Sequence, residues 1–314
     1  MPESSDLIDV HHHFLTPRYV AARERLGIRT GPGFEGALDW TVESSLAAMD
    51  RAGIAKAVLS FTSNWTPFDA AEARDLARDA NEFAARLVAD RPGRFAFFAA
   101  LPMPQVDAAL AEIAHAMDEL GAVGVSTTTN YGDRWPGDPA FDPVFAELDR
   151  RRAIVFVHPQ APLAAQRLTP PVPDGTVEFM FDIMRCITAM LFRGTFARFP
   201  NIRFIFTHGG GGLPALVERI ARNAALQPAV AEAMPEGAAA ILRRLYFDIT
   251  TSTNAAAFAG LRAFVPPGRL LFGTDFPFVP PAATLWGLDV ATGHEPELRQ
   301  LIRRGNAEAL FGQG

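Results

Sequence analysis

The stretch L-I-D-V-H-H-H-F, residues 7–14, decides how the rest of the chain is interpreted. Its apolar residues Leu7, Ile8, Val10 and Phe14 give it the pattern of a short buried β-strand. Three consecutive histidines in such a strand are unusual in a chain that has only 7 histidines. The run is too short, and its surroundings too apolar, for the remnant of an affinity tag. It is therefore either a chance cluster or one part of a metal site.

Seven further runs of β-branched and aromatic residues follow this strand, and helical patterns separate them. The eight predicted strands are Leu7–Phe14, Ala55–Thr62, Arg94–Leu101, Ala122–Asn130, Ile154–His158, Arg203–His208, Leu245–Thr251 and Leu270–Thr274. The predicted helices are Val42–Ala52, Asp69–Asp90, Val106–Leu120, Asp142–Arg152, Val177–Phe199, Pro214–Ala225, Asn254–Phe264 and Glu295–Leu310.

This alternation predicts the fold. Strands that alternate with helices form a parallel sheet, and eight is the number of strands that closes a (β/α)8 TIM barrel. An open doubly wound sheet is the alternative, and it is disfavoured because no G-x-G-x-x-G motif follows the first strand. Two irregular stretches, Thr16–Asp39 and Gln160–Gly175, follow strand ends. We therefore expect one domain over residues 1–314, an α/β barrel with loop insertions at its C-terminal face.

The composition excludes several classes of protein. A net charge of −6 argues against nucleic-acid and anionic-membrane partners. The single cysteine, Cys186, rules out a disulfide within the chain and favours a reducing compartment. The polar start, Met1–Asp6, does not look like a signal peptide, and the longest apolar runs are too short to span a bilayer. We expect a cytoplasmic protein.

Side chains that bind metals gather at the carboxyl ends of the predicted strands. They are His11 and His13 on the first strand, His158 on the fifth, His208 on the sixth and Asp275 just after the eighth. Because strand side chains alternate between faces, His11 and His13 should point the same way and His12 the other, as a packing residue.

If Asp9, His11 and His13 face the barrel interior, two imidazoles converge on one point. His158 would add a third imidazole and Asp275 a carboxylate. Three imidazoles and one carboxylate, with room for water, are typical of an open catalytic site for one divalent ion. This donor set predicts Zn²⁺, with Mn²⁺ as the alternative.

His208 stands in T-H-G-G-G-G-L-P, which allows three interpretations. The glycines could simply permit a sharp turn into the following helix. A phosphate-binding loop is disfavoured because its Lys-Ser/Thr pair is missing. The preferred interpretation is that a backbone without side chains lets a substrate approach, while His208 acts as general acid or base.

Taken together, four motifs resemble the amidohydrolase superfamily. They are D-V-H-H-H, V-F-V-H-P, T-H-G-G-G-G-L-P and L-F-G-T-D-F-P. The resemblance is to the branch that contains aminocarboxymuconate-semialdehyde decarboxylase and 6-methylsalicylate decarboxylase-like proteins. It implies that His11, His13, His158 and Asp275 are metal ligands and that His208 is catalytic. It also implies that Arg219 reaches the substrate of a neighbouring subunit, and hence a homodimer.

Departures from the family pattern bear on the substrate. The stretch V-E-S-S-L-A-A-M-D lacks the substrate-binding arginine of the semialdehyde decarboxylases, and Gln160 replaces their tryptophan. Gly211 stands where the resorcylate-type decarboxylases have a glutamate. We therefore expect another substrate, a small aromatic carboxylic acid. The side chains expected to face it are Phe14, Trp65, Tyr131, Trp135 and Phe278.

The expected activity is non-oxidative decarboxylation of a hydroxylated aromatic acid. The metal would chelate the carboxylate and an ortho hydroxyl, and Asp275, or a water activated by His208, would protonate the ring carbon. The alternative is a metal-dependent hydrolase or hydratase acting on a lactone, an amide or a ring-cleavage product. It would use the same residues on a bound water whose pKa the metal lowers to about 7. A metal-binding protein without enzymatic activity is the third hypothesis.

Overall fold

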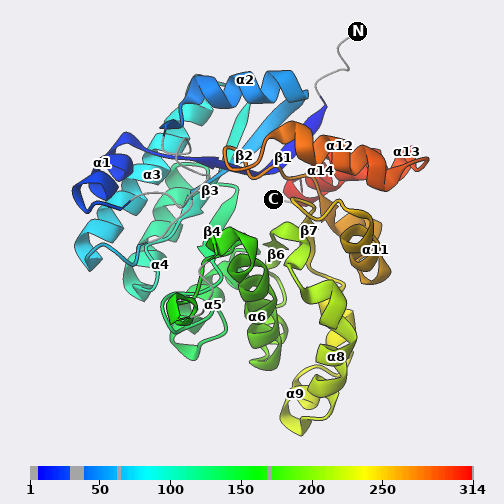
Figure 1. Cartoon of the computed structure of the whole chain (residues 1–314). Coiled ribbons are helices and arrows are strands. Elements are labelled where there is room, and N and C mark those ends of the chain that lie inside the picture. Colours follow the sequence, from blue (N-terminus) through cyan, green and yellow to red (C-terminus); the bar gives the residue numbers. More distant parts are fainter. Residues whose placement is uncertain (1–5, 29–38, 62–64, 168–171, 313–314) are drawn as a thin grey trace.

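A computed structural model describes residues 6–28, 39–61, 65–167 and 172–312 and contains one sheet of eight parallel strands (Figure 1). Neighbouring strands follow the order of the chain. The strands are β1 (Leu7–Phe14), β2 (Ile54–Phe61), β3 (Phe95–Ala100), β4 (Gly124–Thr128), β5 (Ile154–His158), β6 (Arg203–Phe206), β7 (Tyr246–Asp248) and β8 (Leu270–Leu271). All eight predicted strands are thus present, although β4, β6, β7 and β8 are clearly shorter than expected.

Backbone hydrogen bonds close the sheet on itself. The amide of Val10 in β1 donates to the carbonyl of Phe272 just after β8, at 3.0 Å. Further along, His13 N donates to Phe276 O at 2.7 Å, and Asp275 N donates to His11 O at 2.7 Å. The (β/α)8 barrel is therefore confirmed, and the open doubly wound sheet is excluded.

Helices surround the barrel on its outside (Figure 1). They are α1 (Pro17–Arg25), α2 (Val42–Ala52), α3 (Ala70–Asp90), α4 (Val106–Ala114), α5 (Asp142–Arg150), α6 (Glu178–Phe192), α7 (Thr195–Arg198), α8 (Leu213–Ala225), α9 (Pro228–Ala233), α10 (Ala238–Leu242), α11 (Ala255–Phe264), α12 (Pro281–Thr292), α13 (Pro296–Gln300) and α14 (Asn306–Phe311). Among the described residues, no helix is both long enough and apolar enough to cross a bilayer.

The helical predictions need correction at several places. Helices α9, α10 and α12 were not predicted, and the helix expected over Glu295–Leu310 contains a π-helical segment, Leu301–Gly305, between α13 and α14. The helix expected over Val177–Phe199 is divided into α6 and α7, because Gly194 adopts a left-handed conformation with φ 66° between them. The stretch expected to be irregular after β1 begins with α1, which Thr16 caps through its side chain and Pro17 starts. Three parts of the predictions lie outside the described residues. They are residues 29–38 of this irregular stretch, residues 168–171 of the irregular stretch Gln160–Gly175, and Thr62 at the end of the second predicted strand.

Apolar side chains fill the interior of the barrel toward the amino-terminal ends of its strands. The inner cluster is made of Ile8, Val10, Val58, Phe98, Ile154, Phe156, Ile205, Tyr246, Leu271, Ala307 and Leu310. The last two belong to α14, which closes the amino-terminal end of the barrel, and Arg203 donates a hydrogen bond to the Leu310 carbonyl at 2.8 Å. Polar side chains are therefore left to the carboxyl end, where barrel enzymes carry their sites.

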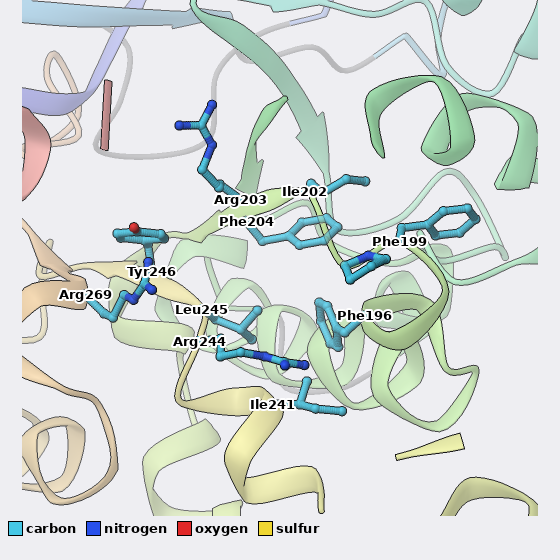
Figure 2. Close-up of a pocket in the computed structure, with 11 residues that line it drawn as sticks. Phe196, Phe199, Ile202, Arg203, Phe204, Ile241, Arg244, Leu245, Tyr246 and Arg269 are labelled. Atoms are coloured by element: carbon cyan, nitrogen blue, oxygen red, sulfur yellow. The ribbon is translucent and has the colours of Figure 1, made fainter. Parts of the chain in front are cut away.

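A pocket of about 170 Å³ lies at the amino-terminal ends of β6 and β7 (Figure 2). Two of its arginines make contacts within the fold. Arg269 stacks over the Tyr246 ring at 4.2 Å, and Arg203 donates a hydrogen bond to the Leu310 carbonyl in α14. None of the site residues expected from the sequence lines it. The candidate site must be sought at the other end of the barrel.

A β-bulge in β1 changes the direction of its histidines. Between Asp9 and His12, β1 advances three residues while β2 advances only two, from Ala57 to Leu59. Val10 belongs to the inner cluster, yet His11 also points inward and contacts the ring of Phe156 at 5.2 Å. The conditional expectation that Asp9 faces the interior with His11 is therefore wrong. The bulge places Asp9 with His12, whose Nδ1 lies 3.0 Å from Asp9 Oδ2.

Candidate metal centre

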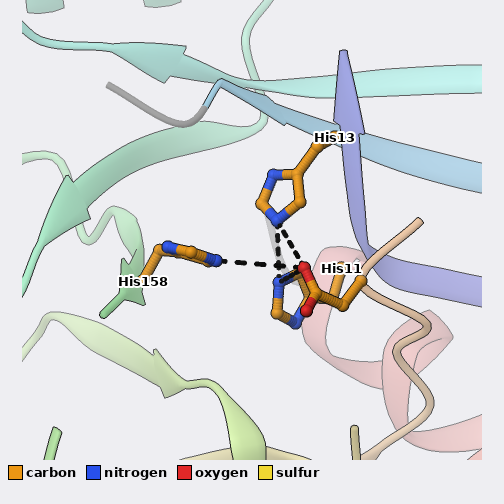
Figure 3. A group of neighbouring side chains, drawn as sticks. His11, His13 and His158 are labelled. Carbon is orange, nitrogen blue, oxygen red and sulfur yellow. Dashed lines mark hydrogen bonds and ion pairs between the residues drawn. The ribbon is translucent and has the colours of Figure 1, made fainter. Parts of the chain in front are cut away.

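Four side chains meet at the carboxyl end of the barrel (Figure 3). His11 and His13 come from β1, His158 from the end of β5, and Asp275 from the segment after β8, and their ligand atoms all lie within 4.8 Å of one another. Asp275 Oδ1 is 3.0 Å from His13 Nε2, 3.3 Å from His11 Nε2 and 4.0 Å from His158 Nε2. The four residues singled out from the sequence are thus brought together from the first, fifth and last parts of the barrel.

The donor atoms fit a divalent metal ion. His11 Nε2 and His13 Nε2 lie 3.0 Å apart, and two imidazole nitrogens at that distance need a proton or a cation between them. The buried His158 Nε2 has no hydrogen-bond partner within the described part of the chain. Since an unpaired buried polar atom is costly, a cation bound by these nitrogens and the carboxylate would relieve both features.

The opposite nitrogen of each ligand histidine is held by an acceptor. The partners of Nδ1 are Asp248 Oδ2 for His11 at 2.9 Å, the Ser60 carbonyl for His13 at 3.2 Å and the Pro159 carbonyl for His158 at 2.9 Å. A proton on Nδ1 leaves the lone pair on Nε2, which is the atom that faces the cluster. The surrounding chain thus orients all three rings for metal binding.

Asp248 at the end of β7 is a site residue that the sequence analysis missed. One carboxylate oxygen contacts His11 Nδ1, and the other accepts hydrogen bonds from the backbone N–H groups of His208 at 2.9 Å and Thr250 at 3.0 Å. Asp248 lies in the middle of the predicted strand Leu245–Thr251, whereas the observed β7 ends at Asp248, so the prediction did not place its carboxylate at the barrel rim. Asp248 connects a ligand histidine to the segment that carries His208.

The cluster shifts the pKa values of its members. Burial lowers the pKa of His13 and of His208, and it holds the pKa of His158 well below its ordinary value. For His11, burial acts in the same direction but is outweighed by the carboxylates of Asp248 and Asp275, which raise its pKa to about 10. Burial would raise the pKa of Asp275, but His11 and its hydrogen bonds hold that pKa well below its usual range.

His208 lies beside the four-residue cluster, just after β6. Its Nε2 is 4.0 Å from Asp275 Oδ2 and has no hydrogen-bond partner among the residues described, while its Nδ1 is 3.2 Å from Thr251 Oγ1. His208, Thr251 and Asp275 all have positive φ, at 51°, 55° and 65°. Such strained backbone persists only where the surrounding structure enforces it, and it gathers at functional sites.

The four glycines after His208 serve packing. A Cβ on Gly211 would lie 2.1 Å from the carbonyl oxygen of Met180 in α6, and one on Gly210 would lie 2.9 Å from the ring of Phe247. Both residues also have positive φ. The preferred interpretation, that the missing side chains leave room for substrate, is therefore wrong, because α6 and β7 occupy that space.

Phe14 and Trp65 need correction as substrate contacts. Phe14 packs against Phe61 and Phe83 with ring centroids 5.4 and 6.2 Å away, on the side of β1 that faces α3. Trp65 stacks on Phe61 and donates its indole N–H to the Leu101 carbonyl at 2.7 Å. Phe14 alternates with His13 along β1 and therefore points outward, into the layer between strands and helices. Trp65 is buried in the same layer by its contacts with Phe61 and Leu101.

The other expected substrate contacts have different positions. Phe278 lies beside the cluster, with its ring 5.6 Å from His13. The Tyr131 hydroxyl accepts a hydrogen bond from Thr128 N, and burial raises its pKa to about 12. Trp135 donates to the buried carboxylate of Asp182 at 3.0 Å. Arg219 is exposed on α8. Only Phe278 among these is in ring contact with a residue of the cluster.

Replacing Asp248 by asparagine should weaken metal binding by roughly 10- to 100-fold. Both carboxylate oxygens accept hydrogen bonds, so an amide would have to direct its NH₂ group at a donor, either His11 Nδ1 or the two backbone amides. Competition with a chelator measures the affinity. Glu112→Gln is the matched control, since Glu112 is also buried and accepts from two side chains, Arg78 and Asn81, outside the site. Equal affinities in the two variants would contradict the role of Asp248.

Comparisons with known proteins agree with this geometry. Residues 8–313 match the model of a family described as amidohydrolase. A decarboxylase of Aspergillus niger is 34% identical over 98% of this chain and 87% of its own length. The 6-methylsalicylic acid decarboxylase of Penicillium expansum is 32% identical over 97% of this chain and 95% of its own.

Solved structures show the same architecture. The crystal structure of an amidohydrolase II matches with a TM-score of 0.86 and 28% identity, over 98% of this chain and 99% of that one. A 5-carboxyvanillate decarboxylase from Novosphingobium aromaticivorans, complexed with manganese and 4-hydroxy-3-methoxy-5-nitrobenzoic acid, gives 0.83 at 21% identity, over 98% and 96% of the two chains. The second likeness concerns the fold alone. From the match over almost its whole length, we conclude that the chain belongs to the amidohydrolase family.

Proposed function

We propose that this protein is a divalent-metal-dependent decarboxylase that removes CO₂ from a hydroxylated aromatic acid without oxidation. The observation that carries the proposal is the convergence of His11, His13, His158 and Asp275 at the barrel mouth. His208 lies beside them, and its Nε2 has no hydrogen-bond partner among the described residues. The names of the similar proteins support the reaction class, because both relatives described above are decarboxylases.

The metal is proposed to be bound by the four clustered side chains. When bound, a divalent ion would supply the positive charge that orients the substrate carboxylate and an ortho oxygen and stabilises their negative charge. Imidazole donors suit Zn²⁺, which we propose as the native ion, while the manganese in the 5-carboxyvanillate decarboxylase supports Mn²⁺ as the alternative. Elemental analysis of the purified protein distinguishes the two.

The reaction requires a proton donor. An aryl carboxylate can lose CO₂ once the ring carbon that bears it has taken up a proton. The bond between that carbon and the carboxylate then breaks, and its electron pair returns to the ring. One proton is consumed for each CO₂ released, so a protein group must hold a proton close to the ring carbon and take a new one from solvent.

His208 is the proposed proton donor. Its Nε2 lies 4.0 Å from Asp275 Oδ2 and carries no hydrogen bond within the described chain, while Thr251 and the backbone contact to Asp248 fix the ring. Because the pKa of Asp275 lies well below its usual range, its carboxylate is ionised near neutrality, holds no proton to donate and serves better as the ionised partner of His208. The proton would pass from His208 Nε2 to the ring carbon.

The proposed substrate is an aromatic monocarboxylate such as 6-methylsalicylate. Aromatic rings border the cluster, with Phe278 at 5.6 Å from His13 and Phe179 of α6 at 6.3 Å from His158. Both rings are partly exposed, and we propose that they contact an aromatic ring held over the ligands. The relative from Penicillium expansum, named for 6-methylsalicylic acid, supports this class of substrate.

The test is to incubate metal-loaded protein with a panel of hydroxybenzoates and measure CO₂ release and the arene product. We expect turnover of at least one ortho-hydroxylated acid, and none after removal of the metal. Absence of CO₂ from the whole panel, 6-methylsalicylate included, would overturn the proposal. Incorporation of solvent ¹⁸O into a lactone or amide without CO₂ would instead identify a metal-dependent hydrolase.

Replacing His208 by glutamine should lower kcat by roughly 10²- to 10⁴-fold, because the amide keeps the side chain's length and polarity but transfers no proton. Metal content should stay at the wild-type level, since His208 is outside the four-residue cluster. Single-turnover CO₂ release and elemental analysis measure the two quantities. His294→Gln, at an exposed position outside the site, is the control. A His208→Gln protein with wild-type kcat would exclude His208 as the donor.

A further inference from the structure

His12, the middle residue of the histidine triplet, takes no part in the four-residue cluster. It is fully buried, and both of its ring nitrogens are engaged. Nδ1 lies 3.0 Å from Asp9 Oδ2, and Nε2 lies 3.0 Å from the hydroxyl of Ser45 in α2. The ring also stacks on Phe276 at 4.7 Å with an interplanar angle of 26°. A polar ring buried between three defined partners needs an explanation beyond packing.

The hydrogen bonds around His12 run in one direction. Trp40 Nε1 donates to Ser45 Oγ at 2.9 Å, which leaves the Ser45 hydroxyl hydrogen free to be donated to His12 Nε2. His12 then carries its own proton on Nδ1 and donates it to Asp9. Each donor in this chain has one acceptor, so the ring is held in a single orientation and tautomer.

Asp9 connects His12 to the two segments that close the barrel, β1 and the segment after β8. Its Oδ1 accepts from the backbone N–H of His11 at 3.1 Å and of Thr274 at 3.0 Å. Its Oδ2 also accepts from the Thr274 hydroxyl at 2.6 Å, and that hydroxyl accepts from Phe276 N at 3.1 Å. One carboxylate therefore joins the bulge of β1 to the residues immediately before and after Asp275.

Asp275 needs such support, because its backbone has a positive φ of 65°. A non-glycine residue keeps that conformation only if the surrounding contacts enforce it. His12 contacts both flanks of Asp275, through the Asp9–Thr274 hydrogen bonds on one side and by stacking on Phe276 on the other. No other side chain of the triplet has this position.

We infer that His12 is a positioning residue, which fixes the Asp275 carboxylate relative to His11 and His13 through the chain Trp40–Ser45–His12–Asp9–Thr274. The inference rests on the proposed function only in requiring that the four clustered side chains bind a divalent ion. It predicts that changes at His12 alter the geometry of the metal site without removing a ligand.

Two variants separate the contacts of His12. His12→Phe keeps an aromatic ring on Phe276 but loses both hydrogen bonds. His12→Asn keeps a donor close to the position of Nδ1, and with it the bond to Asp9, but loses the stacking and the link to Ser45. Ser45→Ala removes only the outer link, leaves the ring in place and tests the same chain if His12→Phe does not fold.

The experiment uses the full chain loaded with Co²⁺, whose visible absorption reports the ligand geometry. For His12→Phe we expect an altered Co²⁺ spectrum, a metal affinity lowered at least tenfold, and a kcat lowered at least tenfold with KM within about twofold of wild type. His12→Asn should recover part of each change. Ser45→Ala should change the spectrum in the same direction by a smaller amount.

The control for general loss of stability is Asn306→Ala. Asn306 is buried near the opposite end of the barrel and donates two hydrogen bonds of 2.7 Å, to the carbonyls of Pro267 and Leu270. Its loss should lower Tm and leave the Co²⁺ spectrum unchanged. The inference is overturned if the spectra and metal affinities of His12→Phe and Ser45→Ala match those of wild type or of Asn306→Ala. Wild-type protein that binds no Co²⁺ would overturn the proposed metal site itself.

Discussion

Replacing Asp275 by asparagine should lower CO₂ release by roughly 10³-fold or more. Asp275 Oδ1 lies 3.0 and 3.3 Å from the Nε2 atoms of His13 and His11, and Oδ2 lies 4.0 Å from His208 Nε2. The amide has nearly the same shape but removes the negative charge. The metal would then lose its one anionic ligand, and His208 would lose its ionised partner.

Three measurements check this prediction. Elemental analysis should show less bound metal, chelator competition should show weaker binding, and kcat should stay low even at saturating metal. Glu112→Gln, which neutralises another buried carboxylate in α4, should retain activity. An Asp275→Asn protein with wild-type kcat at saturating metal would exclude Asp275 from the site.

Removal of the metal should abolish CO₂ release, and recovery should depend steeply on pH. In the metal-free protein, Asp248 and Asp275 outweigh burial and raise the pKa of His11 to about 10, so this ring is protonated near neutrality. A metal ion must displace that proton from His11. The apparent association constant for the metal should therefore rise by about tenfold with each unit increase in pH up to that pKa, and it should level off at higher pH.

This pH dependence can be measured by titrating chelated protein with Mn²⁺ between about pH 6 and 8.5 while following the protons released. Asp248→Asn supplies the internal comparison, because loss of the nearest carboxylate should lower the pKa of His11 and move the plateau to lower pH. An association constant that does not change with pH would show that His11 already has a free lone pair. Activity that survives complete removal of the metal would contradict the proposed function.

The barrel and the meeting of its polar residues could be predicted from the sequence for one physical reason. Parallel strands all end at the same rim, so side chains at strand ends become neighbours even when they are far apart in the chain. This applied to His11, His158 and Asp275 without knowledge of any loop. It could not identify Asp248, because the seventh strand was predicted to run to Thr251 and the structure ends β7 at Asp248.

The predictions that were wrong concern features that depend on irregular backbone or on packing between distant segments. The bulge in β1 breaks the alternation from which Asp9 was expected to face inward, and no periodic pattern encodes it. Phe14 and Trp65 are of the residue types expected in a pocket for an aromatic substrate, but the same types also fill the hydrophobic core, where both lie. The glycines after His208 reflect the approach of Met180 and Phe247, which are distant in sequence.

Other expectations stay predictions. They are the single domain, the cytoplasmic location, the choice of Zn²⁺ and the homodimer in which Arg219 reaches a neighbouring subunit. Sedimentation of the wild-type and Arg219→Ala proteins, together with their KM values, would test the last of these. If Arg219 served a neighbour's site, KM should rise in the variant while the protein remained a dimer.

The closure of the barrel has a consequence for how the protein is made. The amide of Val10 is bonded to the carbonyl of Phe272, and the floor of the barrel is sealed by Ala307 and Leu310 of the last helix. A nascent chain can pair its first strand with β2 early, but it lacks the segment after β8 and the helix α14 until late in synthesis. His11 and His13 therefore leave the exit tunnel long before Asp275, and the four ligands can meet only after the segment that carries Asp275 has left it as well. Until then a metal ion that binds His11 and His13 meets an incomplete set of ligands, without the carboxylate of Asp275.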